Sequence, residues 1–491
     1  MNILGASSAT VQVLVCLAIT LLIGVATWAK VRRAGARGSD GSSKDVYLAG
    51  GALSWPFVAG AITLTNLSTD QLVGMNGNQM LLLAWWEISG FVGLLILAFV
   101  FVPIYYRAQV TTVTELLEKR YGGGSIRTLV SALFLFGMIL IYLPAGLYSG
   151  GLFLQTLFGT DVPIIVFAAI LGVIAAAYTI SGGLRTVAVM ETYAGVGVLA
   201  VAVLVVVLAL NAVGWDISSG VPAERLTMVG AKDSPIPFHT LFTGMIFIQI
   251  YYWSTNQPIT QKAMAAPTVR EAQKGVLAAA CIRILIIPAI VVIPGVVAFK
   301  LFGDIDDAAY GRLVGEVLPP WMSGAFAAMI AAAVIAHTSA VLNAAVGLYA
   351  VDFHDRFVRP VANHWRLAAV TSVVLTVTSI VLVPVFENAK SIINLLQQLN
   401  GLSSMPILSA FIVALLFKGV EARAAIVGVV WGVVLYGLYT FVLEPQGMVT
   451  MHYIDFMVVT LATSVAMGLA TNRLVFGGRA EWRWRQSAAA V

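Results

Sequence analysis

Long apolar segments recur along the whole chain and constrain its fold more than any other feature. A bilayer core about 30 Å thick is crossed by roughly 20 apolar helical residues, and thirteen segments approach that length. Because 59% of the 491 residues are hydrophobic and 10% are charged, an ordinary soluble surface is excluded. The sequence therefore predicts an all-α polytopic membrane protein. The predicted spans are 8–29, 50–76, 80–106, 126–156, 162–180, 186–213, 238–259, 276–302, 321–351, 366–386, 390–417, 422–443 and 452–476.

The distribution of basic residues predicts how these spans are oriented. If the N-terminus lies outside, the inner connectors, Lys262 included, hold 22 of the 28 Lys and Arg residues, and Arg283 alone lies within a span. Cytoplasmic loops carry such an excess. We expect a cytoplasmic C-terminus and a multi-pass protein of the plasma membrane, in bacteria the inner membrane. Because the net charge of +5 is dispersed over short connectors, it does not indicate nucleic-acid binding.

The segments outside the spans are too short for a separate soluble domain. We expect one integral membrane domain over 1–491, with an extra N-terminal span at 8–29 and a ten-helix core at 50–417. Two peripheral spans at 422–476 and a cytoplasmic tail at 477–491 complete it. Trp482 and Trp484 of the tail could rest at the membrane interface. The isolated Cys16 and Cys281 indicate neither a disulfide nor a metal site.

Polar residues interrupt two of the predicted spans. The stretch 62–79 is rich in amides, hydroxyls and glycines, and 249–258 is rich in amides and aromatic residues. Such residues are tolerated at membrane depth only where they face a protein interior or a watery cavity, so a substrate or ion site is expected there. The interruptions lie five spans apart, which reverses the direction of the second. Two inverted five-helix repeats, each beginning with a broken helix, are therefore predicted, as in many secondary transporters.

An ordered series of short motifs between about residues 45 and 420 resembles the solute:sodium symporter family, most closely its sodium–glucose and sodium–galactose branch. The resemblance implies a LeuT-like core that carries a sugar by alternating access, needs no cofactor beyond a coupling ion, and catalyses no covalent reaction. It implies the lipid bilayer as surroundings and no obligate protein partner. The motifs are Tyr47-Leu-Ala-Gly50, Trp86-Glu87, Thr114-Glu-Leu-Leu-Glu-Lys-Arg-Tyr121, Gly182-Gly-Leu184, Tyr251-Tyr-Trp-Ser-Thr-Asn-Gln257, Glu271-Ala-Gln-Lys-Gly275, Pro294-Gly295, Leu342-Asn343 and Gln397.

The resemblance also implies roles for single residues. Met75 would be an outer lid, and Tyr252, backed by Trp253, an inner platform. Amides and a carboxylate suit the hydroxyls of a hexose, and an aromatic face suits its apolar surface. Helix packing, a structural ion pair and ordinary aromatic packing are the alternative roles for these side chains. The implied sugar-contacting residues are Asn66, Gln71, Glu87, Gln249, Arg283 and Gln397.

The family's sodium site is altered in this sequence. The resemblance places backbone carbonyls near Leu64 and Leu67 and at Ala333, but it places Ala336 and His337 where sodium-coupled relatives have two hydroxyl side chains. Sodium prefers oxygen ligands, which a methyl group and an imidazole do not supply. The sodium site is therefore expected to be incomplete.

These changes favour coupling to H+ through His337, because histidine titrates near physiological pH. Glu191 and Asp70 are further candidates for a proton carrier. An uncoupled uniporter and sodium coupling through carbonyls alone remain alternatives. So do transport of another small solute, such as proline, a carboxylate or a polyol, and a role as a transporter-like membrane sensor.

Overall fold

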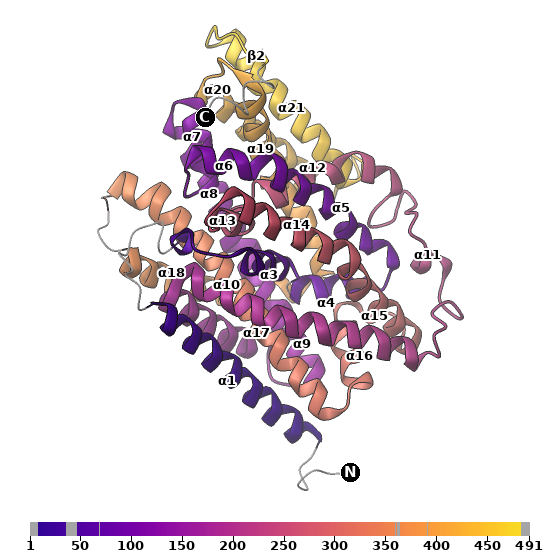
Figure 1. Cartoon of the computed structure of the whole chain (residues 1–491). Coiled ribbons are helices and arrows are strands. Elements are labelled where there is room, and N and C mark those ends of the chain that lie inside the picture. The colour runs from indigo at the N-terminus through magenta and orange to yellow at the C-terminus, as the bar shows by residue number, and fades with distance from the viewer. Residues whose placement is uncertain are drawn as a thin grey trace.

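Tilted helices that run side by side form nearly all of the computed structural model (Figure 1). It describes residues 8–35, 47–67, 69–358, 360, 364–389 and 391–482. Most of the linker expected before residue 47 and the end of the tail, Trp484 included, lie outside the described residues. The main helices are α1 (Ser8–Gly35), α3 (Trp55–Asn66), α4 (Thr69–Gly77), α5 (Ala84–Ile96), α6 (Val102–Ala108), α7 (Val113–Tyr121), α8 (Gly124–Gly137), α9 (Leu143–Phe158), α10 (Ile164–Ala212), α12 (Gly244–Ser254), α13 (Gln257–Met264), α14 (Val269–Leu285), α15 (Ile287–Phe302), α16 (Ala309–Val317), α17 (Pro320–Leu348), α18 (His364–Phe386), α19 (Ile392–Leu416), α20 (Ala422–Leu438) and α21 (Tyr453–Leu474).

Short elements connect or extend these helices. Four of the extensions, η4, η5, η8 and η9, are π-helical turns at the ends of α5, α8, α17 and α20. The short elements are η2 (Ala49–Gly51), η3 (Leu81–Leu83), η4 (Leu97–Phe101), η5 (Met138–Tyr142), α11 (Ala223–Leu226), η6 (Phe238–Phe242), η7 (Asp306–Ala308), η8 (Tyr349–Val358), η9 (Tyr439–Leu443), β1 (Phe417–Lys418) and β2 (Glu481–Trp482).

The predicted spans are found as helices. Within the described ranges, nine helical stretches are long and apolar enough to cross a membrane. Thr10–Ala26 and Ile164–Ile180 are shorter apolar helices, and the pairs α3/α4 and α12/α13 are the two interrupted spans. All thirteen predicted segments are thereby accounted for, and the prediction of an all-α polytopic membrane protein is confirmed.

Both polar interruptions are breaks in helices. α3 ends at Asn66, and the backbone of Leu67 leaves the helical region with φ −73° and ψ 60°. α12 ends at Ser254, Asn256 is extended, and Pro258 follows in the first turn of α13. Proline has no N–H and a fixed φ, so it suits the first turn of a helix and removes a backbone hydrogen bond elsewhere. The freed backbone groups are therefore available for other partners.

Two local features differ from the sequence prediction. α10 remains helical through 181–185, where a connector is predicted, and the segment contains no proline. The predicted tail begins with β2, which pairs with β1 so that Trp482 lies opposite Phe417, with ring centroids 5.2 Å apart. Backbone pairing therefore ties the start of the tail to the end of α19.

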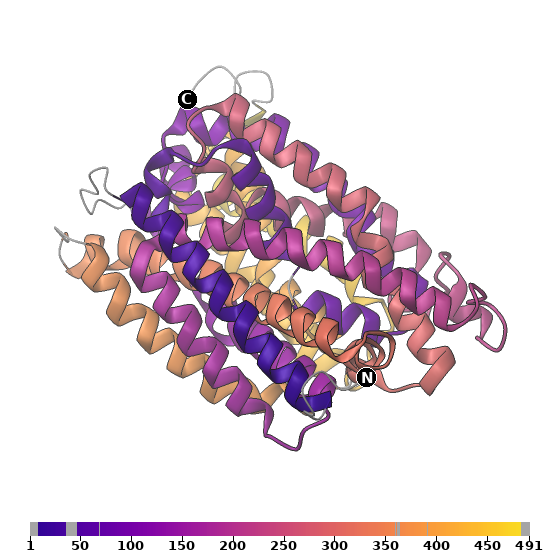
Figure 2. The same ribbon diagram turned by 60° about the horizontal axis from the view of Figure 1, so that its bottom comes forward.

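α17 lies at the centre of the bundle and is almost wholly buried. Most of its middle consists of alanine and other small residues, which allow neighbouring helices to approach closely. It packs against α10 and α9, and α1 crosses it from the outside of the bundle (Figure 2). Gln12 of α1 donates to the Ser323 hydroxyl at 2.9 Å. The helix that carries His337 is thus enclosed on several sides.

Candidate functional site

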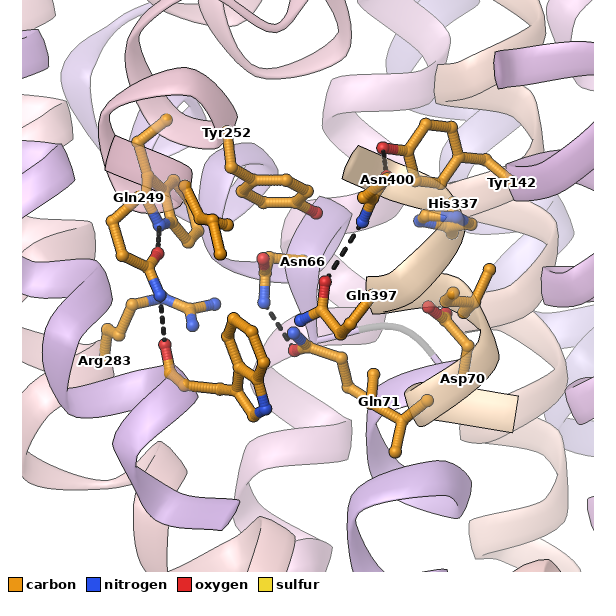
Figure 3. A pocket seen from close by; sticks show the side chains of 15 residues that line it. Asn66, Asp70, Gln71, Tyr142, Gln249, Tyr252, Arg283, His337, Gln397 and Asn400 are labelled. Carbon is orange, nitrogen blue, oxygen red and sulfur yellow. Dashed lines mark hydrogen bonds between the residues drawn. The ribbon is translucent and has the colours of Figure 1, made fainter. Parts of the chain in front are cut away.

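The break between α3 and α4 and the last turns of α12 border one polar cavity (Figure 3). Side chains from α3, α4, α5, η5, α12, α14, α17 and α19 line it. The lining residues are Asn66, Asp70, Gln71, Trp86, Tyr142, Ile248, Gln249, Tyr252, Trp253, Arg283, His337, Ile393, Leu396, Gln397 and Asn400. Residues from both predicted repeats therefore meet at one place.

Arg283 and Glu87 form a buried ion pair at one side of this cavity. The Arg283 guanidinium also lies 4.3 Å from the centre of the Trp253 ring, a distance suited to a cation–π interaction. With its amide oriented to satisfy its neighbours, Asn66 accepts from Arg283 Nη2 at 2.5 Å and donates to the Tyr252 hydroxyl at 3.1 Å. Because Glu87 balances its charge, Arg283 presents directed donors without adding net charge to the site.

Close contact between α5 and α12 positions Gln249 and Trp253. At Gly93 an added Cβ would come within 2.4 Å of the Gln249 carbonyl oxygen, so a side chain there would force the helices apart. Gln249 Nε2 donates to the Trp86 carbonyl at 2.9 Å and to the Ser89 hydroxyl at 2.8 Å, while its Oε1 accepts from Trp253 Nε1 at 2.9 Å. These bonds fix the amide and the indole ring at the cavity wall.

Tyr142 and Asn400 extend the polar wall on the opposite side. The Tyr142 hydroxyl donates to the Asn400 side-chain oxygen, and Asn400 Nδ2 donates to Gln397 Oε1 at 3.1 Å. Neither residue is predicted as a site residue from the sequence. The three-residue spacing of Gln397 and Asn400, which places both on one face of α19, is the signal that could have found Asn400. Tyr142 ends the π-helical turn η5 inside an otherwise apolar span, and no sequence signal points to it.

His337 lies beside the break between α3 and α4. Its Nδ1 is 2.8 Å from the carbonyl oxygen of Thr65. A carbonyl can only accept, so Nδ1 carries the proton. A Cβ at Gly146 would be 3.6 Å from Nε2, and Asp70 lines the same cavity. The imidazole can therefore take a second proton at Nε2 without losing its bond to the broken helix.

A second ion pair lies behind Thr65, away from the cavity lining. Lys262 Nζ is 2.5 Å from Glu191 Oε1 and donates to the Ala61 carbonyl at 3.2 Å, and the Thr65 hydroxyl donates to the same Glu191 oxygen at 2.7 Å. Lys262 and Glu191 are both 0% exposed. The expectation that Lys262 lies in a connector is wrong, because α13 turns inward beneath α3 and carries the lysine into the bundle.

The model of the sodium:solute symporter family matches residues 46–432. This chain belongs to that family. The family consists of transporters, so the protein is a secondary symporter and not an enzyme. The resemblance drawn from the motifs is confirmed.

Relatives of this symporter include transporters that are named for different solutes. It is 34% identical to the uncharacterized symporter YidK of Escherichia coli, over 87% of this chain and 78% of that one. It is 27% identical to the sodium/glucose cotransporter of Vibrio parahaemolyticus, over 84% and 81% of the two chains. It is also 27% identical to the mouse sodium/myo-inositol cotransporter 2, over 86% and 68%.

Solved structures confirm the LeuT-like fold of the symporter. A Na+-coupled sialic acid symporter in a substrate-bound outward-open state aligns with a TM-score of 0.79 at 16% identity, over 96% of this chain and 99% of that one. Mhp1, a nucleobase-cation-symport-1 family transporter, aligns with a TM-score of 0.57 at 18% identity, over 86% and 92%. At these identities the likeness concerns the fold alone.

The cavity of this symporter contains most of the residues that the sequence singles out. Five of the six predicted sugar contacts line it, and Glu87 stands behind Arg283. Tyr252, Trp253, His337 and Asp70 line it as well. Met75 is fully buried in α4 outside the lining, and Glu191 lies in the second ion pair. The structure thus brings the predicted residues together, and their roles stay predictions.

The predicted sodium-site positions also lie near the break. Ala333 and Ala336 are fully buried on α17, one turn or less before His337. Leu67 directly follows the last residue of α3, and the side chain of Leu64 is not among the described parts of the structure. The imidazole of His337 therefore contacts the same broken helix whose carbonyls are implied as sodium ligands.

Proposed function

We propose that this symporter carries a neutral monosaccharide, such as glucose or galactose, together with a proton held by His337. The cavity supports a neutral polyhydroxyl substrate because its walls present amides and an arginine already neutralised by Glu87. A carboxylate solute would require a cation without such a partner. Two of the relatives are named as cotransporters of glucose and of myo-inositol, which are both uncharged polyols. A cyclic polyol is therefore the second candidate.

The observation that supports proton coupling is the position of His337. Protonation at Nε2 gives an imidazolium whose Nδ1–H keeps its bond to the Thr65 carbonyl. Tyr142 and Gly146 flank the ring, Asp70 lines the same cavity, and the neutral Lys262–Glu191 pair stands behind Thr65. Proton and sugar can thus occupy one cavity, and alternating access to it moves both in one cycle.

Uptake of labelled sugar into proteoliposomes tests this coupling. With an inward pH gradient and no sodium, we expect accumulation by the wild type and only equilibration by His337→Gln, which keeps a polar side chain but cannot carry the proton. His239→Ala, which changes an exposed histidine outside the cavity, is the matched control and should behave as the wild type. Uptake that does not change with the pH gradient but increases with sodium would disprove the proton proposal.

Sugar binding as a function of pH tests the same residue without transport. We expect the affinity to fall as pH rises through the titration of His337, by at most about tenfold per pH unit because one proton is linked to binding. His337→Gln should give a flatter profile. Competition by glucose, galactose, myo-inositol, proline and a sugar acid identifies the solute class, and preferential binding of the acid would exclude a neutral substrate.

A further inference from the structure

Lys262 is a buried cation that does not line the transport cavity. Its side chain is 0% exposed, and its ammonium bonds to Glu191 and to the Ala61 carbonyl. Glu191 Oε2 has no partner among the described residues, so the ammonium and the Thr65 hydroxyl are the groups that stabilise the carboxylate. Separating such a pair in a dry environment leaves two uncompensated charges, which is strongly unfavourable unless water enters at the same time.

The pair joins three elements on the predicted cytoplasmic side. α3 and α13 are the inner halves of the two broken spans, and α10 carries Glu191. Both inner halves pack against each other, and α3 also packs against α10 (Figure 1). Access to the cavity from the cytoplasm requires these segments to separate. Movement of α13 away from α10 would break the bond between Lys262 and Glu191, and movement away from α3 would break the bond between Lys262 and the Ala61 carbonyl.

Thr65 links this pair to His337. Its hydroxyl donates to Glu191 Oε1 at 2.7 Å, and its carbonyl oxygen lies 2.8 Å from His337 Nδ1. Movement of the end of α3 therefore disturbs both bonds together. The charged and titratable groups around this link are Glu191 of α10, Lys262 of α13 and His337 of α17, with Asp70 of α4 on the cavity side.

We propose that the Lys262–Glu191 ion pair is the lock of the cytoplasmic gate and that Thr65 transmits its state to His337. While the lock is closed, the Thr65 carbonyl stabilises the imidazolium. When the lock opens, water solvates the separated charges, α3 moves, and His337 loses that carbonyl, so the proton leaves to the cytoplasm. The inference rests on the proposed function for the proton, whereas the lock itself does not depend on the substrate or the coupling ion.

Thiol labelling tests the lock. In a background without Cys16 and Cys281, Ala263→Cys places a fully buried reporter next to Lys262. We expect Lys262→Met and Glu191→Gln each to raise the maleimide labelling rate by about tenfold or more, since each leaves a buried charge without its partner. Lys274→Met is the matched control, because it removes a lysine from an exposed pair with Glu271 on α14 and should not change the rate.

The double variant Lys262→Met/Glu191→Leu decides whether the two residues act as a pair. It should label no faster than either single variant, because neither charge is left alone. Rates equal to the wild type in both single variants, or a double variant whose effects multiply, would overturn the lock. Hydrogen–deuterium exchange over 257–264 gives the same comparison if the cysteine reporter prevents folding.

Sugar binding measured against pH tests the link through Thr65. In Lys262→Met the binding transition should move to lower pH than in the wild type, because the open lock withdraws the carbonyl from the imidazolium. Faster labelling with an unchanged pH profile would overturn the link. A wild type without any pH dependence would remove the proposed proton coupling, and the labelling result would still decide on the lock.

Discussion

The absence of a side chain at Gly146 determines where the imidazole of His337 can lie. A Cβ at this position would be 3.2 Å from His337 Cδ2 and 3.6 Å from Nε2. We expect Gly146→Ala to displace the ring by a few tenths of an ångström and to lengthen its bond to Thr65. Proton-driven uptake should fall several-fold while sugar still binds at low pH.

Gly137→Ala is the matched control for this substitution. It adds the same methyl group to the same predicted span, but the nearest atom, on Tyr142, would be 3.7 Å away, which is ordinary contact. Uptake driven by a pH gradient, measured beside sugar binding at fixed low pH, separates the two variants. Equal uptake in both would show that the position of His337 tolerates crowding.

Individual site residues could be predicted where polarity is unusual for membrane depth. Asn66, Gln249 and Arg283 stand out in apolar surroundings, and the structure places all three at the cavity. Lys262 could not be recognised, because a lysine near the end of a predicted span has the same sequence pattern whether it faces water or a carboxylate. Its burial depends on the packing of α13 beneath α3, which is tertiary structure and leaves no local sequence pattern.

At the scale of elements, Asp307 joins η7, α4 and α19 at the predicted outer end of the cavity. Its Oδ2 accepts from the backbone N–H of Ile392 at 2.9 Å. Its Oδ1 has no partner among the described residues, and a Cβ at Gly77 would come within 2.3 Å of that atom. Asn78 at the end of α4 donates to the Ser391 hydroxyl at 3.2 Å, beside the same contact. These bonds hold α4 against the start of α19.

Burial raises the pKa of the Asp307 carboxyl to about 7, with the Ile392 amide opposing and Asp306 adding to the shift. Opening of this contact would hydrate the carboxyl and return its pKa towards the ordinary value near 4. The closed contact therefore binds more protons than the open one between about pH 4 and pH 7. It is stabilised at low pH and weakens as pH rises through 7.

We expect the contact between α4 and the start of α19 to open more often at pH 8 than at pH 6. The measurement is made in a His337→Gln background, which removes the titratable imidazole from the cavity. Asp307→Asn keeps an oxygen for the Ile392 amide but does not titrate, so its opening should not depend on pH. Asp306→Asn, an exposed neighbour, should keep most of the dependence. Labelling from the outside of an Ile392→Cys variant, which keeps the backbone N–H that bonds Asp307, measures opening. A pH-dependent Asp307→Asn protein would refute this role.

The helix breaks could be predicted from the sequence, whereas the π-helical turns could not. The breaks coincide with amides, glycines and Pro258, which disturb a helix at their own positions and can therefore be recognised in the sequence. The turns η4, η5 and η9 consist mainly of apolar residues that suit an ordinary helix, and their i→i+5 bonding depends on neighbouring helices. Tyr142 ends one of these turns, so its place in the cavity wall cannot be predicted from the sequence.

At the scale of the whole molecule, the thirteen spans could be predicted because lipid requires long apolar helices. The excess of basic residues in alternate connectors predicts that the N-terminus lies outside and the C-terminus inside. In a background without Cys16 and Cys281, a membrane-impermeant maleimide should label Ala231→Cys in intact cells but Arg270→Cys only after the membrane is permeabilised. Both positions are exposed in connectors of opposite predicted sidedness. The reverse labelling pattern would invert the topology.

His337 is the one imidazole among the described residues that line the cavity. A carrier that moves one proton per sugar has a ceiling on accumulation. A pH difference of one unit is equivalent to about 1.4 kcal/mol, and a membrane potential of 100 mV to about 2.3 kcal/mol per charge. Together they allow a sugar gradient of about 500-fold at most, since each 1.4 kcal/mol is tenfold. In a de-energised membrane such a carrier would run backwards and release its substrate from the cell.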